Sequence, residues 1–139
     1  MMGNLKKDIS SFEDIKLLVN KFYEKVNKDD ILAWIFNDLS KVDWKMHLPV
    51  MYDFWSTILL GTKTYKGQPF DVHLYLPVDE RHFNRWVTLF EETVDENFSG
   101  ETAKEAKLRA NTISEIFQYK IKVIKEDEAK VGMHKHEEE

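Results

Sequence analysis

Apolar residues recur at three- and four-residue spacing along most of the chain, a pattern that predicts helices rather than strands. Ser10 or Ser11 can cap the first helix. Its apolar positions are Ile15, Leu18, Val19, Phe22, Tyr23 and Val26. A short second helix is expected to start at Asp29 or Asp30 and to carry Ile31, Trp34, Ile35 and Phe36.

Three further segments complete the pattern. Asp43 can cap a third helix that ends near Gly61, with one face made of Trp44, His47, Met51, Phe54 and Trp55. After a looser span over residues 62–76, Pro77 and Asp79 open a fourth helix, whose apolar positions are Phe83, Trp86, Val87, Phe90 and Val94. Ser99 or Gly100 breaks the chain before a long last helix with Ala106, Ala110, Ile113, Phe117 and Ile121. The fold class expected is all-α.

The pattern contains no internal repeat and no linker between domains. A chain of 139 residues is long enough for one domain with a real core. We therefore expect a flexible N-terminus over residues 1–8, one domain over residues 9–124, and a charged, disordered tail over residues 125–139.

Composition narrows the function. The net charge of −5 provides no basic surface for nucleic acid or an anionic membrane, and no segment has the roughly 20 apolar residues of a membrane span. The absence of cysteine excludes disulfides, thiolate haem ligation, iron–sulfur clusters and cysteine-based zinc sites. No signal peptide is recognisable, so a cytoplasmic location is expected.

His73 is the candidate for metal chemistry. It follows a helix-breaking run that contains Gly67 and Pro69, and Pro77 bounds the segment on the other side. An imidazole held in this way can be an axial metal ligand, although a histidine in the core or in a helix cap would look the same. His82, one turn before Trp86, is the competing ligand, or else a first-turn residue of the fourth helix.

The other histidines are weaker candidates. His134 and His136 form a His-x-His pair on the tail, which is expected to be solvated. The chain has no His-Glu-x-x-His motif, so zinc hydrolase chemistry fits poorly.

The apolar stripes are rich in aromatic rings and are interrupted by polar groups. The chain has four tryptophans and nine phenylalanines, most of which are expected in the core, although a planar cofactor also needs aromatic walls. Tyr23, His47 and Trp86 come from three different predicted helices and each brings a hydrogen-bonding group to an apolar face.

Several short motifs, in this order and spacing, resemble those of the group III truncated haemoglobins. The resemblance covers about residues 9–122. Its motifs are Phe22-Tyr23-Glu24-Lys25-Val26, Ile35-Phe36, Trp44-Lys45-Met46-His47, Phe54-Trp55, Tyr65-Lys66-Gly67-Gln68-Pro69 with His73, and Trp86 followed by Leu89-Phe90-Glu91-Glu92. No single motif is specific, but the set is.

This resemblance implies a truncated globin, a two-over-two helical sandwich around haem b, with His73 as the proximal iron ligand. Tyr23, His47 and Trp86 would line the distal, ligand-binding side. The haem contacts would be His73, Phe36, Met51, Phe54, Trp55 and Leu76. Lys66, Arg81 and Arg85 are candidates for the haem propionates, with no preference among them.

The function implied is binding of O₂, NO or CO. A phenol and an indole are suitable donors to O₂, and such a cage retains ligand, which favours redox chemistry over O₂ transport. Nitric oxide dioxygenation or a peroxidase-like reaction would need a reductase, because the chain has no recognisable flavin or nicotinamide domain. Whether it is an enzyme therefore stays open. The alternatives are a gas or redox sensor without turnover, and a haem-free helical scaffold.

Overall fold

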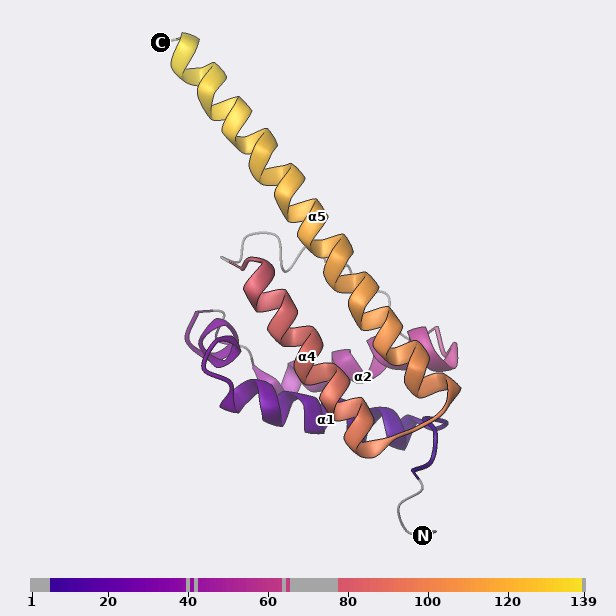
Figure 1. The fold of residues 1–139 in the computed structure, drawn as a ribbon. Coiled ribbons are helices and arrows are strands. Elements are labelled where there is room, and N and C mark those ends of the chain that lie inside the picture. The colour runs from indigo at the N-terminus through magenta and orange to yellow at the C-terminus, as the bar shows by residue number, and fades with distance from the viewer. Residues whose placement is uncertain (1–5, 40, 42, 64, 66–77, 139) are drawn as a thin grey trace.

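The computed structural model describes residues 6–39, 41, 43–63, 65 and 78–138, and these residues form helices and no strand. His73, Leu76 and Lys66 lie outside this part of the chain. The elements, in chain order, are α1 (Phe12–Lys28), the π-helix η2 (Trp34–Leu39), α2 (Trp44–Leu60), α4 (Glu80–Asn97) and α5 (Glu101–Glu138) (Figure 1).

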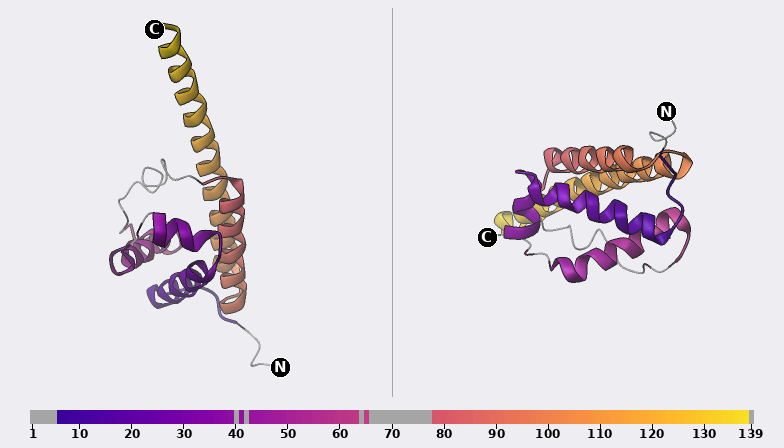
Figure 2. Two further views of the ribbon diagram at one scale, coloured as in Figure 1. Left: turned by 90° about the vertical axis from the view of Figure 1, so that its left-hand side faces the viewer. Right: turned by 90° about the horizontal axis from the view of Figure 1, so that it is seen from below.

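The four long helices of the described ranges form two pairs. Helix α1 packs against α2 and α4, and α5 packs against α4 and α2. Figure 2 shows α4 and α5 side by side in one layer, with α1 and α2 in the other. The all-α class and the two-over-two arrangement that were predicted from the sequence are confirmed.

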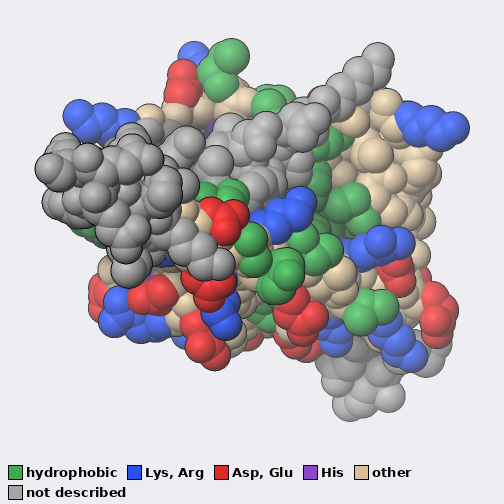
Figure 3. All heavy atoms as spheres, turned by 90° about the horizontal axis from the view of Figure 1, so that it is seen from above, with side chains coloured by type: hydrophobic (Ala, Val, Ile, Leu, Met, Phe, Trp, Pro, Cys, Tyr) green, Lys and Arg blue, Asp and Glu red, His purple; other side chains and the backbone are tan. Residues whose placement is uncertain are grey.

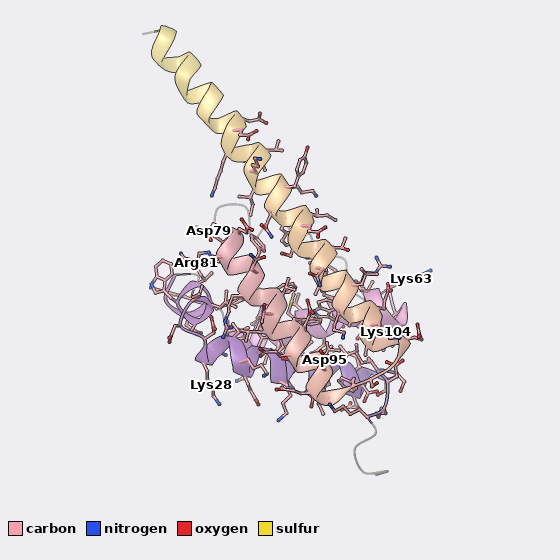
Figure 4. All side chains as sticks on the ribbon, viewed as in Figure 1. Lys28, Lys63, Asp79, Arg81, Asp95 and Lys104 are labelled. Carbon is pink, nitrogen blue, oxygen red and sulfur yellow. The ribbon has the colours of Figure 1, made fainter. Side chains whose placement is uncertain are left out.

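The helix ends form where the sequence predicts them. Ser11 caps α1 in a capping box with Asp14, and Asp43 caps α2 by accepting from the amide of Lys45. Helix α2 ends at Gly61, whose φ of 69° is the left-handed conformation that favours glycine. Asp79 caps α4, and Figure 4 places it with Arg81 at one end of that helix.

The segment after α1 differs from its prediction. The turn at Trp34 to Leu39 is a π-helix instead of an α-helix. The Asp29 carboxylate starts this segment by accepting hydrogen bonds from the amides of Ile31 and Leu32, at 3.1 and 3.0 Å. The same carboxylate accepts from Nε of Arg85 on α4 at 2.5 Å, which ties the end of α1 to α4.

Asp8, close to the N-terminus of the chain, caps the start of α5. Asp8 accepts from the amides of Thr102 and Ala103 at 2.9 and 2.8 Å. Gly100, which precedes the helix, has no side chain for capping, and its φ of 138° and its closeness to Asp8 both require glycine. Asp8 therefore holds the N-terminal segment to the body of the domain.

Helix α5 continues past the domain as a rod (Figure 1). Ile121, at 5% exposure, packs with Ile35 and Val78 and is the last side chain of α5 that is buried among those described. The predicted disorder of residues 125–139 stays a prediction, although the backbone is helical through Glu138.

The core lies between the two layers and combines aromatic rings with a larger number of aliphatic side chains. Phe22, Phe90 and Val94 are fully buried at its centre. Figure 3 shows hydrophobic side chains across the middle of one face, with charged side chains mostly at its rim. Within the described residues, no helix has both the length and the apolarity that crossing a membrane requires.

Candidate functional site

Tyr23, on the inner face of α1, is the centre of the candidate site. Its side chain is 6% exposed, and its hydroxyl oxygen lies 3.4 Å from Nε2 of His47 on α2. Burial raises the pKa of the Tyr23 phenol, so the group stays protonated and keeps its O–H donor at neutral pH. The structure thus brings together two of the three predicted distal residues.

Aromatic rings enclose this polar pair. Phe36, from η2, has its ring centroid 5.8 Å from Tyr23 and 6.3 Å from His47. Trp44 stacks on Phe36 at 5.7 Å and meets both Tyr23 and His47, at 5.1 and 5.5 Å. The rings of Tyr23, Phe36, Trp44 and His47, from α1, η2 and α2, therefore form one cluster.

Trp86, the third predicted distal residue, lies on α4 and is connected to this cluster through Phe22. Its indole stacks on Phe90 at 5.9 Å and contacts Phe22 edge-on at 5.7 Å. Phe22 also contacts Tyr23 at 4.9 Å, so one buried ring touches both predicted donors. Among the residues that the structure describes, none accepts a hydrogen bond from the half-buried Trp86 indole.

The predicted haem contacts occupy two environments. Met51 and Phe54 are half-buried against the main core, and Phe54 meets Tyr65 at 5.2 Å. Trp55 is 2% exposed and stacks on Phe90 at 4.6 Å, which is the position of a core residue. His73 and Leu76 lie outside the described residues, so their contacts with haem stay predictions.

The alternative histidine has a structural role. His82 completes the capping box of α4, because its Nδ1 accepts the amide N–H of Asp79 at 3.0 Å. This placement agrees with the first-turn interpretation of His82.

Arg85 is paired with Asp29, and with Arg81 it lines an open surface groove of about 870 Å³ at the start of α4.

Trp44, Asn37 and Asn27 take part in the site but were not predicted as site residues. Trp44 was placed on the apolar face of its helix and in a family motif but was given no role in the site, and its aromatic neighbours come from α1 and η2. Its indole N–H donates to Oδ1 of Asn37 at 2.8 Å, and Asn37 donates to Asn27 at 2.7 Å. The one available signal was a tryptophan three residues before His47 on the same face.

Comparison with known proteins agrees with this architecture. The model of the bacterial-like globin family matches residues 6–118. The group 3 truncated hemoglobin ctb of Campylobacter jejuni is 37% identical over 118 residues, which cover 82% of this chain and 93% of the relative. The crystal structure of group III truncated hemoglobin from Campylobacter jejuni superposes with a TM-score of 0.77 at 36% identity, covering 84% of this chain and 95% of that chain.

The described residues fit the haem b that globins hold. A haem iron needs only one imidazole from the protein, and the Phe36 and Trp44 rings give the site flat aromatic walls. The donor chemistry also fits, since a protonated phenol, an imidazole and an indole lie among aromatic walls. The chain therefore belongs to the bacterial-like globins, as a group III truncated haemoglobin that binds haem b and, through it, diatomic gases.

Proposed function

We propose that this globin retains O₂ for redox chemistry instead of carrying it, with nitric oxide dioxygenation as the favoured reaction and a peroxidase-like reaction as the second form. The contact of the buried Tyr23 hydroxyl with His47, at 3.4 Å, is the observation that carries this proposal. A carrier must release its ligand, whereas donors in a dry pocket hold it.

The proposed roles of the side chains follow from their burial. Tyr23 is buried and protonated, so its hydroxyl can donate to a ligand without competition from water. Trp86 offers an indole N–H from α4. Each neutral donor contributes about 0.5 to 1.5 kcal/mol, and one that meets developing charge contributes about 1.5 to 3 kcal/mol.

His47 is proposed as the gate of the distal side. It lies in the first turn of α2, is half-buried, and contacts the buried Tyr23. A side chain at the end of a helix can rotate outward more easily than one in its middle. His47 is therefore expected to control ligand access, while Tyr23 and Trp86 control retention.

On the proximal side, His73 is proposed as the iron ligand. Haem, when bound, supplies the iron that takes up the gas and exchanges electrons, and the protein supplies ligation, donors and access. In the favoured reaction one NO and one O₂ give one nitrate, with one electron lost from the protein. Repeated turnover therefore requires a separate reductase as electron donor.

The test is single-turnover mixing of the reduced, O₂-loaded protein with one equivalent of NO. The proposal predicts one nitrate per haem, formed much faster than O₂ dissociates, and one oxidised haem per nitrate. Turnover should then continue when a flavin-containing reductase and NADH are added. Slow oxidation limited by O₂ release would contradict dioxygenation and would leave the gas-sensor alternative in its place. Peroxide consumption with an electron donor, but no nitrate, would favour the peroxidase-like form.

A further inference from the structure

A chain of three side chains connects the end of α1 to the start of α2 through η2. Nε1 of Trp44 lies 2.8 Å from Oδ1 of Asn37, and Nδ2 of Asn37 lies 2.7 Å from Oδ1 of Asn27. An indole N–H can only donate, so the Asn37 oxygen must face Trp44. The Asn37 nitrogen then faces Asn27, and the orientations of both amides follow from the tryptophan.

The tryptophan at the end of this chain contacts the proposed gate. Trp44 is the first residue of α2, and its ring meets the His47 ring edge-on, at 5.5 Å and 81°. The Trp44 ring also stacks on Phe36, at 5.7 Å and 24°. Trp44, Phe36 and His47 therefore form a triangle of contacts, in which Trp44 touches both the η2 ring and the imidazole that reaches Tyr23.

A first-turn side chain needs such a tether to keep one orientation. The first amides of a helix have no partner within the helix, and helix ends open more readily than helix centres. Asp43 caps the backbone of α2, but a backbone cap does not hold the indole. The bond to Asn37 does, because it adds a directional constraint to the stacking on Phe36.

We propose that Asn27 and Asn37 form a latch that positions Trp44 and, through it, holds His47 in the closed position over Tyr23. Trp44 and Asn37 are positioning residues, since they act on ligand access through His47. This inference rests on the proposed role of His47 as the gate, and it adds the residues that set how often the gate opens.

The size of the effect follows from the bond that is lost. Loss of one neutral hydrogen bond shifts a two-state equilibrium by about 2- to 10-fold. If ligand can bind only when His47 is open, the association rate rises by the same factor. The dissociation rate of O₂ should change less, because Tyr23 and Trp86 are untouched.

The experiment measures CO association after flash photolysis of the reduced haem protein. Asn37→Leu and Trp44→Phe each remove the Trp44–Asn37 bond, and both should speed CO association by about 2- to 10-fold. The double variant should equal either single variant, because both remove the same bond. Matched controls are Asn84→Leu on α4 and Trp34→Phe on η2, where Asn84 is exposed and Trp34 is 49% exposed. Neither control should alter the rate.

A second readout is independent of ligand kinetics. In the diamagnetic CO complex, the His47 imidazole should show one narrow set of NMR signals in the wild type. Asn37→Leu should shift or broaden these signals, and Asn84→Leu should leave them unchanged. An effect confined to unfolding free energy, with unchanged His47 signals and CO rates, would show that the chain only stabilises the fold and would overturn the latch.

His47→Ala separates the two proposals, because it removes the closing side chain. If His47→Ala speeds CO association and Asn37→Leu does not, His47 is a gate but the latch is wrong. If His47→Ala leaves association unchanged, the gate itself is wrong and the latch fails with it.

Discussion

The Tyr23 hydroxyl oxygen lies 3.4 Å from Nε2 of His47, so a buried phenol on α1 and an imidazole in the first turn of α2 share one polar contact. Either group can donate in this contact, depending on the tautomer of His47. Any ligand that accepts from Tyr23 must compete with His47 for the same hydroxyl. Retention and access are therefore coupled at this position.

The first prediction concerns access. His47→Leu removes the polar contact with Tyr23 and leaves an apolar side chain that gains nothing from turning to solvent. We expect several-fold changes in the association rates of O₂ and CO, with a smaller change in O₂ dissociation, as measured by flash photolysis and stopped-flow mixing. A large rise in O₂ dissociation at unchanged association would instead make His47 a ligand anchor.

The second prediction concerns the iron ligand. His73→Gly should lose haem, or should bind added imidazole in the vacated place and recover its absorption spectrum. His82→Ala should keep its haem, because His82 caps α4 through Asp79. The measurement is haem retention during gel filtration, followed by absorption spectra with and without imidazole. Haem loss in the His82 variant alone would refute the assignment of His73.

The sequence predicts a structural feature well when residues close together in the chain decide it. Ser11, Asp43 and Asp79 begin their helices and Gly61 ends α2, as predicted. Capping is decided within three or four residues, so the sequence carries this signal locally. The π-helical turn of η2 was not predicted, because apolar spacing over six residues cannot distinguish it from an α-helix.

Contacts between distant residues account for most of what was missed. Asp29 and Arg85 are 56 residues apart, and Asp8 and Thr102 are 94 residues apart, so neither pair has a sequence signal. Tyr23 and His47 were predicted as site residues by family resemblance. The hydrogen bonds that link Trp44 to Asn27 could not be predicted from the sequence. The partner of an asparagine side chain depends on which elements pack beside it.

The third prediction concerns the start of α5. A Cβ on Gly100 would lie 2.5 Å from Cγ of Asp8, and the φ of 138° is itself unfavourable for alanine. Gly100→Ala should lower the free energy of unfolding by about 1 to 3 kcal/mol, through backbone strain and a displaced cap. Gly61→Ala is the matched control, because its Cβ would meet no atom within 4 Å and only the left-handed φ of 69° is strained. Urea unfolding that finds Gly61→Ala the more damaging would refute the role given to Asp8.

The fourth prediction concerns acid. Partial burial alone would raise the pKa of Asp14, but the Ser10 amide, Lys7 and Ser11 outweigh it and lower the pKa to about 2. A depressed carboxyl pKa contributes stability above the unfolded value of 3.8, and this stability is lost as pH falls from about 4 toward 2.

Asp14→Asn should therefore cost about 1 to 2 kcal/mol at pH 6 and much less at pH 2.5. Urea unfolding at the two pH values provides the measurement. The Asp30→Asn variant, at an exposed position, is the control for the loss of one carboxylate. An Asp14→Asn penalty of equal size at both pH values would mean that the capping geometry matters and the charge does not.

The central claim, that Tyr23 and Trp86 retain O₂, is tested most directly by the O₂ dissociation rate of Trp86→Phe. This substitution keeps much of the ring that stacks on Phe90 and removes the indole N–H. Loss of one hydrogen bond of about 1.5 to 3 kcal/mol should speed O₂ release by about 10- to 100-fold. Tyr23→Phe should act non-additively with it, because both donors would share one ligand. If neither substitution changes O₂ dissociation by twofold, the donors do not retain O₂, and the redox function loses its physical support.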